Sequence, residues 1–305
     1  MVFEGDITAC FDEIDHLALM NQVRGRVGDK RVLGLVRAFL KAGVLTENGA
    51  EEKTDAGTPQ GGILSPLLAN IALSALDDHF MRTWAPSWEA RRRQRDQGGA
   101  TYRLVRYADD FVVMVKGTRA HAESLREPVA EALRPIGLRL SETKTKTAHI
   151  DEGFEFLGHR IQRQPKRGAR GKSYVYTFPA KDALARIKGE VRVLTSPKTK
   201  NLTFAVLLYR LNQKLRGWTN YFRHAASSTT FDYLWHYTWW RVWNWLRRKH
   251  PHRHWKWLRR RYYVQRWWPA DGLVKLFNPG DVAIVRHRYR GRQIPTPWQP
   301  TATTT

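Results

Sequence analysis

The chain has 305 residues, of which 42% are hydrophobic, and its 52 Lys and Arg against 28 Asp and Glu give a formal net charge of +24. This composition supplies enough apolar side chains for a sizeable core and excludes a wholly disordered chain. The one cysteine, Cys10, excludes an internal disulfide and a zinc site built on cysteines. No apolar run is long enough to span a bilayer. We therefore expect a reduced, cytoplasmic setting and no membrane partner.

The charge is distributed unevenly along the chain. Residues 1–155 contain 21 Lys and Arg against 23 Asp and Glu, whereas residues 156–305 contain 31 against 5. Ten of the 13 tryptophans lie between Trp218 and Trp268. A cationic, aromatic-rich half attracts polyanions, and nucleic acid is the expected partner. An anionic membrane surface is the less favoured alternative, because the basic residues are spread over 160–292 and do not line a single helix.

Apolar spacing predicts the elements of the first half in this order: a strand over 3–11, a helical region over 17–45, a helix over 65–81, a charged loop over 91–99, a hairpin of strands 102–107 and 111–115, a helix over 120–136 and a strand over 154–161. In the second half it predicts helices over 182–195, 202–224 and 231–250, and a less regular stretch from 263. We place a domain boundary near residue 180.

Three acidic residues are placed for chemistry. Asp6 lies on the first predicted strand, and Asp109 and Asp110 lie at the tip of the predicted hairpin. If these strands pair in one sheet the carboxylates meet, and carboxylates at close range raise each other's pKa unless a cation compensates them. Mg²⁺ takes oxygen ligands of this kind, together with phosphate and water. The alternative interpretation is that two neighbouring aspartates at a hairpin simply form a solvated turn.

The residues around these acids resemble a known family. The sequence YADD at 107–110 resembles the signature hairpin of reverse transcriptases. Four further segments resemble motifs of that family and occur in the same order. Residues 6–12 resemble its first metal-binding strand, and residues 57–66 (GTPQGGILSP) resemble its template and nucleotide loop. Residues 141–145 (SETKT) resemble its lysine motif, and residues 156–159 (FLGH) resemble its primer-gripping turn. The sequences DEIDH at 12–16 and LRGWTNYFRH at 215–224 resemble those of the group II intron reverse transcriptase/maturases. The likeness continues over 239–251 and 286–295.

This resemblance implies an α+β fold in two parts. A reverse-transcriptase palm, an antiparallel sheet with packed helices, would occupy 1–180. An all-α thumb/maturase domain would follow over 181–262, with a basic C-terminal extension over 263–305. The implied function is an RNA-directed DNA polymerase that is also an intron RNA splicing cofactor. Its implied partners are intron RNA, an RNA template with a DNA primer, and deoxynucleoside triphosphates, in a bacterial-type cytoplasm.

The resemblance also implies roles for individual residues. Asp6 and Asp109, with the main-chain carbonyl of Ile7, would ligate two Mg²⁺ ions, for which Mn²⁺ is an alternative. Asp110 would contribute charge more than direct ligation. Lys144 would protonate the leaving pyrophosphate in a phosphoryl transfer. A solvated loop lysine is the alternative for Lys144.

Nucleotide and primer contacts follow from the same resemblance. Phe11 lies where the family has a steric gate against a ribose 2′-hydroxyl, and ordinary core packing is the alternative. Gln60, Gly61 and Gly62 would contact the template base and the incoming nucleotide, and a plain turn is the alternative. The implied primer grip consists of Phe156, Leu157 and Gly158.

The second half carries the expected RNA contacts. The implied RNA-binding residues are Arg216, Trp218, Arg223, His224, Arg241, Arg247, Arg248 and Lys249. Helical spacing puts Trp235, Trp239, Val242 and Leu246 on one stripe, which we assign to the core. Trp240, Trp243, Asn244 and Arg247 share a second stripe, which either stacks on bases or packs against a neighbouring helix. For His250, His252 and His254 we favour RNA contact or solvent exposure over a metal site.

Two features of this sequence depart from the family. Members carry a fingers region before the first metal-binding strand, whereas this sequence begins inside that strand. Some members end in a Cys/His-bearing endonuclease domain, which a single cysteine excludes from these 305 residues. We therefore expect a piece of a longer reading frame, and we keep a non-catalytic RNA-binding maturase fragment as the alternative function.

Overall fold

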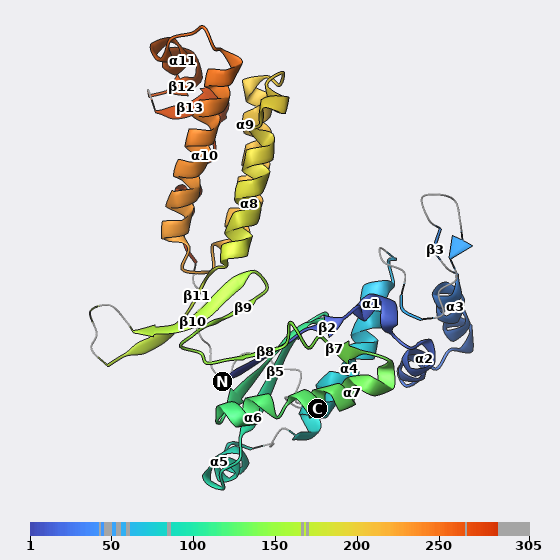
Figure 1. The fold of residues 1–305 in the computed structure, drawn as a ribbon. Coiled ribbons are helices and arrows are strands. Elements are labelled where there is room, and N and C mark those ends of the chain that lie inside the picture. Colours follow the sequence, from blue (N-terminus) through green and yellow to red (C-terminus); the bar gives the residue numbers. More distant parts are fainter. Residues whose placement is uncertain are drawn as a thin grey trace, which may run out of the picture. The chain divides into compact units, whose positions relative to one another are not determined.

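The computed structural model describes residues 1–42, 44–45, 51–52, 56–58, 62–83, 87–165, 168, 171–265 and 267–285. These residues divide into two compact units, one ending at Phe156 and the next beginning at Leu157 (Figure 1). Below they are called unit 1 and unit 2. Within the described residues no helix combines the length and the apolar character that a membrane crossing requires.

Unit 1 is built on an antiparallel sheet. Its four strands have the order β5 (Thr101–Tyr107), β6 (Asp110–Lys116), β1 (Val2–Gly5) and β8 (Lys146–Ala148). Two short ribbons, β2 (Ile7–Thr8) with β7 (Arg139–Leu140) and β3 (Val44–Leu45) with β4 (Glu51–Glu52), and the strand β9 (Phe154–Phe156) complete its strands. Phe3, Phe111 and Val113 are fully or almost fully buried, so β1 and β6 form the centre of the sheet and of the core.

Helices pack against this sheet. They are α1 (Cys10–Glu13), α2 (His16–Arg24), α3 (Lys30–Lys41), α4 (Ser65–Thr83), α5 (Trp88–Asp96), α6 (Arg119–Glu123), α7 (Arg126–Leu133) and the 3₁₀ turn η1 (Arg134–Ile136). The long helix α4 packs against α2, α7 and β5. It buries Leu68, Leu73 and Leu76 in the same core as the sheet, which fixes α4 beside the strand that leads to the acidic hairpin.

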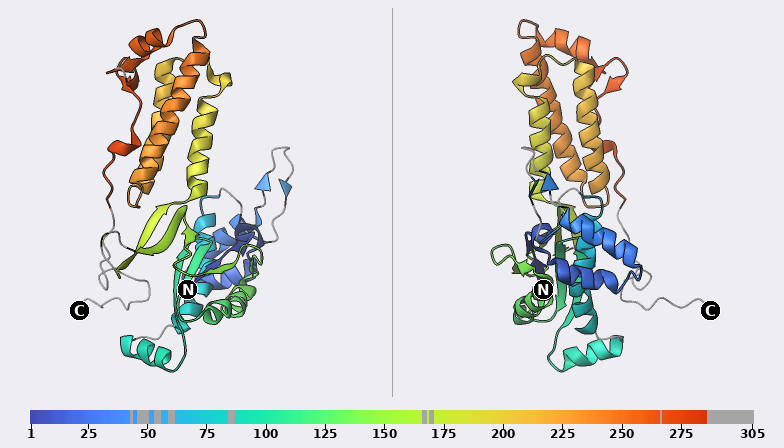
Figure 2. Two further views of the ribbon diagram at one scale, coloured as in Figure 1. Left: turned by 60° about the vertical axis from the view of Figure 1, so that its left-hand side comes forward. Right: turned by 90° about the vertical axis from the view of Figure 1, so that its right-hand side faces the viewer.

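Unit 2 is largely helical. Its elements are β10 (His159–Pro165), β11 (Ser173–Pro179), α8 (Lys181–Leu194), η2 (Pro197–Thr199), α9 (Phe204–Phe222), α10 (Ser228–Lys249), α11 (Trp255–Tyr262), β12 (Tyr263–Val264), β13 (Trp268–Asp271), β14 (Val274–Lys275) and η3 (Pro279–Asp281). Helices α8, α9 and α10 lie side by side (Figure 2). Their shared core contains Val191, Leu211, Leu215, Val242 and Leu246, one or more from each helix at helical spacing.

The structure confirms the predicted fold class, an antiparallel sheet with packed helices followed by a helical region. The helices predicted over 65–81, 182–195, 202–224 and 231–250 are all present, and the last ends at Lys249, one residue before the predicted end, with His250 as its C-cap. The helix predicted over 120–136 is interrupted between α6 and α7, and Pro128 lies in the first turn of α7, where a missing N–H costs nothing.

Two local predictions were wrong. The strand predicted over 3–11 ends at Thr8, because Ala9 adopts a left-handed conformation (φ 44°) that turns the chain into α1. The charged loop predicted over 91–99 is mostly helix α5. The Ser87 side chain caps that helix by accepting from the amide of Ala90, and Arg92 pairs with Asp96 one turn away.

The two units divide earlier in the chain than the predicted boundary near 180. The ribbon of β10 and β11 belongs with the helices of unit 2, because it packs on them. The His159 ring lies 4.8 Å from that of Phe222, and the amide of Ala226 donates to the carbonyl of Thr177 (2.7 Å).

Candidate active site and nucleic-acid interface

The first feature of the site is the register that brings distant acidic residues together. Strand β1 pairs antiparallel with β6 so that Gly5 lies opposite Phe111, and Tyr107 lies opposite Asp110 across the hairpin. Asp6 directly follows Gly5 and therefore emerges beside Asp110, the first residue of β6. Residues about one hundred positions apart in the sequence thus lie at one end of the central sheet.

The pKa of Asp110 reflects its closeness to the other two acidic residues. Burial raises the pKa of the Asp110 carboxyl above its ordinary value of 3.8, and the negative charges of Asp109 and Asp6 raise it further. The Cys10 thiol lies behind the same cluster. Burial, with the charge of Asp109 next in importance, raises its pKa to about 12, so Cys10 stays a neutral, buried thiol.

A close backbone contact sets the position of Asp6. A Cβ atom on Gly5 would lie 2.0 Å from the Phe111 ring, a distance that no side chain allows. The missing side chain at Gly5 is therefore what leaves room for the buried ring of Phe111, its partner across the β1–β6 pairing. This contact lies one residue away from both Asp6 and Asp110.

The hairpin tip has a strained residue and a side chain that holds it. Ala108 has φ 53°, which is uncommon for a residue with a Cβ. Its carbonyl accepts a hydrogen bond from Nη1 of Arg106 (2.9 Å). Arg106 thereby fixes the turn that carries Asp109. Sequence reasoning missed this residue, although its position directly before YADD was a usable signal.

Lys144 also reaches the acidic cluster. Its Nζ lies 3.3 Å from Oδ2 of Asp6, while its side chain is 70% exposed. The loop that carries Lys144 is anchored nearby, because the amide of Ser141 donates to the carbonyl of Asp6 (2.8 Å). An exposed ion pair of this kind is weak, so a divalent ion can displace the lysine from Asp6.

The donor set fits magnesium. In the described residues no group of three or more His, Cys, Asp or Glu side chains is arranged as a complete metal site. Mg²⁺ does not need one, because it is usually held by one or two carboxylates with waters and substrate phosphates. Asp6 and Asp109 would supply two carboxylates. The amide of Ser141 donates to the carbonyl of Asp6, and in an antiparallel ladder the next pair, Ile7 and Leu140, is then a non-hydrogen-bonded one. The Ile7 carbonyl would therefore face away from β7 and could supply a third oxygen.

The residues expected to contact the nucleotide are only partly described. Phe11 is half-buried against the core of unit 1, so its ring is packed yet partly accessible. Its carbonyl accepts from the amide of Thr58 (2.6 Å), which ties the loop after Gly57 to α1. Gly62 lies just before α4, and its carbonyl accepts from the amide of Ser65. Gln60 and Gly61 lie outside the described residues.

The predicted primer grip lies at the division between the units. Phe156 is the last residue of β9 and is half-buried. Leu157 (φ 49°) and Gly158 (φ 72°) both have left-handed backbones, which makes this a tight two-residue turn. In unit 2 the hydroxyl of Tyr221 donates to the Leu157 carbonyl (2.8 Å), so α9 holds one side of the turn.

The residues predicted to bind RNA fall into two groups. Most of them already have contacts within unit 2. Trp218 is packed in the interior and donates to the carbonyl of Ala183, while Arg223 and His224 lie against the chain near Val285. Arg241, Arg248 and Lys249 donate to main-chain carbonyls or to Thr195 where α8 ends and η2 follows.

The second group is exposed. The Arg216 guanidinium lies over the ring of Phe277 on an exposed part of α9. Arg247 is exposed and makes no hydrogen bond or ion pair with any described residue. Of the second predicted stripe, Trp240 is exposed, whereas Trp243 stacks on Trp239. Trp243 is thus packed within unit 2, and base stacking by Trp240 stays a prediction. The structure also contains a cleft between the C-terminal end of α10 and the beginning of α11, which sequence reasoning did not predict.

Residues 1–161, which contain the antiparallel sheet and the acidic hairpin, match the family model described as reverse transcriptase (RNA-dependent DNA polymerase). Residues 184–263 match the model described as group II intron, maturase-specific domain. The chain therefore belongs to the group II intron reverse transcriptase/maturase family.

Its relatives include protein YkfC of Escherichia coli (35% identical over 234 residues, 70% of this chain and 56% of YkfC). The group II intron-encoded protein LtrA of Lactococcus lactis is 28% identical over 299 residues, 76% of this chain and 50% of LtrA. The chain spans about half the length of these relatives. Among solved structures, apo telomerase from Candida tropicalis superposes with a TM-score of 0.43 at 13% identity, over 81% of this chain and 46% of that chain.

Proposed function

We propose that this chain carries the catalytic palm of an RNA-directed DNA polymerase and the RNA-binding part of a group II intron splicing cofactor. The observation that carries the proposal is the β1–β6 register, which supports a common site for Asp6, Asp109 and Asp110 in a chain of this family. The substrates are a DNA primer on an RNA template and a deoxynucleoside triphosphate.

The reaction is a nucleotidyl transfer. The primer 3′-hydroxyl oxygen attacks the α-phosphorus of the nucleotide and forms the new phosphodiester bond. The bond between the α-phosphorus and the bridging oxygen breaks, and pyrophosphate leaves. Two divalent ions, when bound, would lower the pKa of the attacking hydroxyl and neutralise the pyrophosphate.

The chain's own residues position these groups. The carboxylates of Asp6 and Asp109, with the Ile7 carbonyl, supply the oxygens that hold the ions, and Asp110 adds negative charge beside them. Lys144 donates a proton to the leaving pyrophosphate, since its ammonium group reaches the cluster from an exposed side chain. The Phe11 ring excludes a 2′-hydroxyl, and the turn at Leu157 and Gly158 contacts the primer.

The polymerase part is tested by primer extension on an RNA template. The full chain with Mg²⁺ should extend the primer, and Asp109→Ala should abolish extension without unfolding the protein. Asp78→Ala, on the exposed side of α4, is the matched control and should retain activity. Equal extension by wild type and Asp109→Ala would refute the assigned site.

The splicing part rests on the maturase-specific match and on the charge of the second half. RNA binding needs no catalytic metal, so Asp109→Ala should assist splicing of a group II intron as well as wild type does. If wild type fails in primer extension while splicing assistance persists, the alternative of a non-catalytic RNA-binding maturase fragment holds. If Asp109→Ala remains folded and RNA-bound but loses splicing assistance, the separation of the two roles is wrong.

A further inference from the structure

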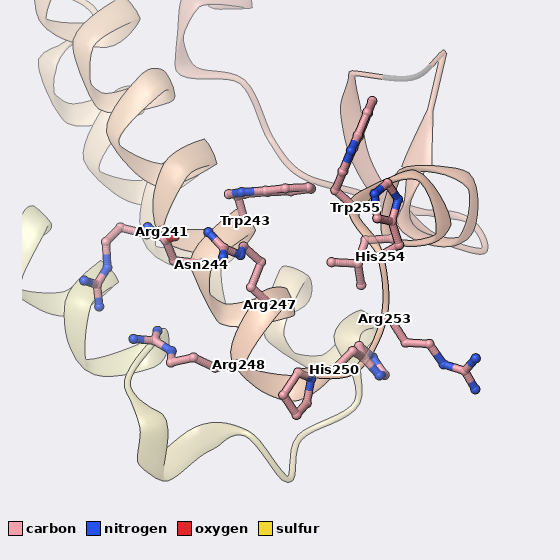
Figure 3. A pocket seen from close by; sticks show the side chains of 11 residues that line it. Arg241, Trp243, Asn244, Arg247, Arg248, His250, Arg253, His254 and Trp255 are labelled. Atoms are coloured by element: carbon pink, nitrogen blue, oxygen red, sulfur yellow. The ribbon is translucent and has the colours of Figure 1, made fainter.

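A cleft of about 920 Å³ opens in unit 2 between the C-terminal end of α10 and the beginning of α11. Figure 3 shows Trp243 and Arg247 projecting from α10 on one side, and His254 and Trp255 on the other. Four arginines and two histidines line it, and the described lining residues include no acid. The volume is within the range of ligand-binding pockets, roughly 300–1,000 Å³.

The arginines of the cleft do not all have the same role. Arg241 and Arg248 are directed toward α8, where they hydrogen-bond to Thr195 (3.0 Å from Arg241 Nε to Oγ1, 2.7 Å from Arg248 Nη2 to the carbonyl) (Figure 3). They satisfy main-chain and side-chain oxygens at the C-terminal end of α8. Arg247 and Arg253 are exposed, and neither forms an ion pair within the described part of the chain.

The charge of this segment is unusual for an internal structural cleft. Between residues 233 and 270 the sequence contains ten Lys and Arg and no Asp or Glu. Nothing in this stretch neutralises Arg247 or Arg253, so the cleft is a site of positive potential. Such a site attracts phosphate groups.

Two tryptophans supply flat apolar surfaces beside these cations. Trp255 is 46% exposed, although burial of an indole is strongly favourable. The cations of Lys256 and Arg259 lie 5.9 Å and 5.6 Å from its ring centre. Trp243 is held in place by stacking on Trp239, with 6.0 Å between ring centres and 12° between planes. An exposed, cation-flanked indole is a good platform for a nucleobase.

We propose that this cleft binds one unpaired nucleotide of the RNA, with its base stacked on Trp255 and its flanking phosphates on Arg247 and Arg253. The proposal rests on the RNA-binding function proposed above and specifies where and how unit 2 engages the RNA. A base within a duplex is stacked on its neighbours, so Trp255 reaches only a base in a loop, bulge or single strand. The cleft therefore selects single-stranded RNA elements.

The stacking is tested by binding of the full chain to a labelled single-stranded RNA and to a duplex of the same sequence. Trp255→Ala should weaken binding to the single strand by about 5- to 100-fold and binding to the duplex by less than about twofold. Trp255→Phe, which keeps an aromatic face, should recover most of the affinity. Trp88→Ala is the matched control, since Trp88 is 49% exposed on α5 of unit 1.

The phosphate contact is tested by salt dependence. Arg247→Gln should reduce the slope of log affinity against log salt by about 0.7 on the single strand. Arg210→Gln is the control, because Arg210 is exposed on α9 and, like Arg247, has no hydrogen-bond or ion-pair partner in the described structure. Its effect on the slope should be smaller.

The outcomes separate this proposal from the one it rests on. Equal losses on single strand and duplex for Trp255→Ala would overturn base stacking, as would recovery by neither Phe nor any other aromatic residue. If wild type binds RNA tightly and none of the cleft variants changes affinity or slope, the cleft assignment fails and the RNA-binding function stands. If wild type binds neither RNA, the proposed function itself fails.

Discussion

Arg106 and Asp77 form the most buried ion pair at the candidate active site. Nε and Nη2 of Arg106 both contact Oδ2 of Asp77 on α4, and the Arg106 side chain is only 12% exposed. Nη1 donates to Oδ1 of Asn70 (2.8 Å) as well as to the Ala108 carbonyl. One guanidinium thus links the longest helix of unit 1 to the hairpin turn, and we regard Arg106 as a positioning residue for Asp109.

Replacing this guanidinium tests that role. Lys at position 106 keeps the charge but cannot contact Asp77, Asn70 and Ala108 together, because an ammonium is a point donor. Arg106→Lys should lower kcat for primer extension by about tenfold or more, with KM for the nucleotide little changed, and should cost about 1–3 kcal/mol of stability. Arg103→Lys, exposed on the same strand, should change neither. Steady-state kinetics at a temperature where both variants are folded provides the measurement.

The Gly5–Phe111 contact predicts an effect of a single methyl group. Gly5→Ala places a Cβ 2.0 Å from Cζ of Phe111 and should destabilise unit 1 by about 1–3 kcal/mol, while moving Asp6 away from Asp110. Gly34→Ala, within α3 and with no atom near the added Cβ, should be neutral or stabilising by about 0.5–1 kcal/mol. Denaturant unfolding measures both. Equal stability of the two variants would contradict the close approach of β1 and β6.

The raised pKa of Asp110 predicts a pH dependence of stability. Below the ordinary value of 3.8 the carboxyl is protonated in both folded and unfolded chains, and the repulsion from Asp6 and Asp109 is absent. As pH rises through the higher folded pKa, the folded state gains a carboxylate that burial disfavours most and that Asp109 and Asp6 repel, so it loses stability. Without metal, Asp110→Asn should therefore have a higher Tm than wild type at neutral pH.

That difference has its own controls. It should shrink as pH falls toward 3.8, and Mg²⁺ should also reduce it by stabilising wild type more than the variant. Asp78→Asn should show no such pattern. A Tm difference that is independent of both pH and Mg²⁺ would contradict the raised pKa of Asp110 and its two causes, burial and the neighbouring carboxylates.

Lys144 should matter for chemistry and not for folding. Because its side chain is 70% exposed, Lys144→Gln should change the free energy of unfolding by less than about 0.5 kcal/mol. Primer extension should slow by about 10²-fold, the low end of the effect of losing a general acid. Lys146→Gln, on the adjacent strand β8, should retain activity. Unchanged extension by Lys144→Gln would remove this residue from the mechanism.

The sequence was most informative where periodicity and motif agreed. The helices of unit 2 were predictable because a long apolar pattern at helical spacing indicates only a helix. The hairpin around YADD was predictable because two apolar runs separated by a short polar turn indicate paired strands. The turn at Ala9 was not, since a left-handed alanine has no sequence signature. Helix α5 was missed because its stability comes from a cap at Ser87 and from charged side chains, not from an apolar face.

At the candidate site, too, some features were predictable from the sequence and others were not. Asp6, Asp109 and Lys144 were predicted from motifs, and the structure supplies what pattern alone does not contain, namely the β1–β6 register and the contact of Lys144 with Asp6. The contacts of Arg241, Arg248 and Lys249 with carbonyls were not predictable either. A basic residue on a helix has the same spacing whether it faces solvent or the end of a neighbouring helix.

The most direct test of the account is oxidative cleavage of the full chain by Fe²⁺ placed at the magnesium site, with ascorbate and peroxide. An ion held between Asp6 and Asp109 should cut the backbone at two distant places, near residues 6 and 109, and Mg²⁺ should suppress both cuts together. Asp109→Asn should lose both cuts, and Asp78→Asn should keep them. Cleavage near only one of the two positions, or cuts that persist in Asp109→Asn, would contradict a shared metal site and the polymerase function built on it.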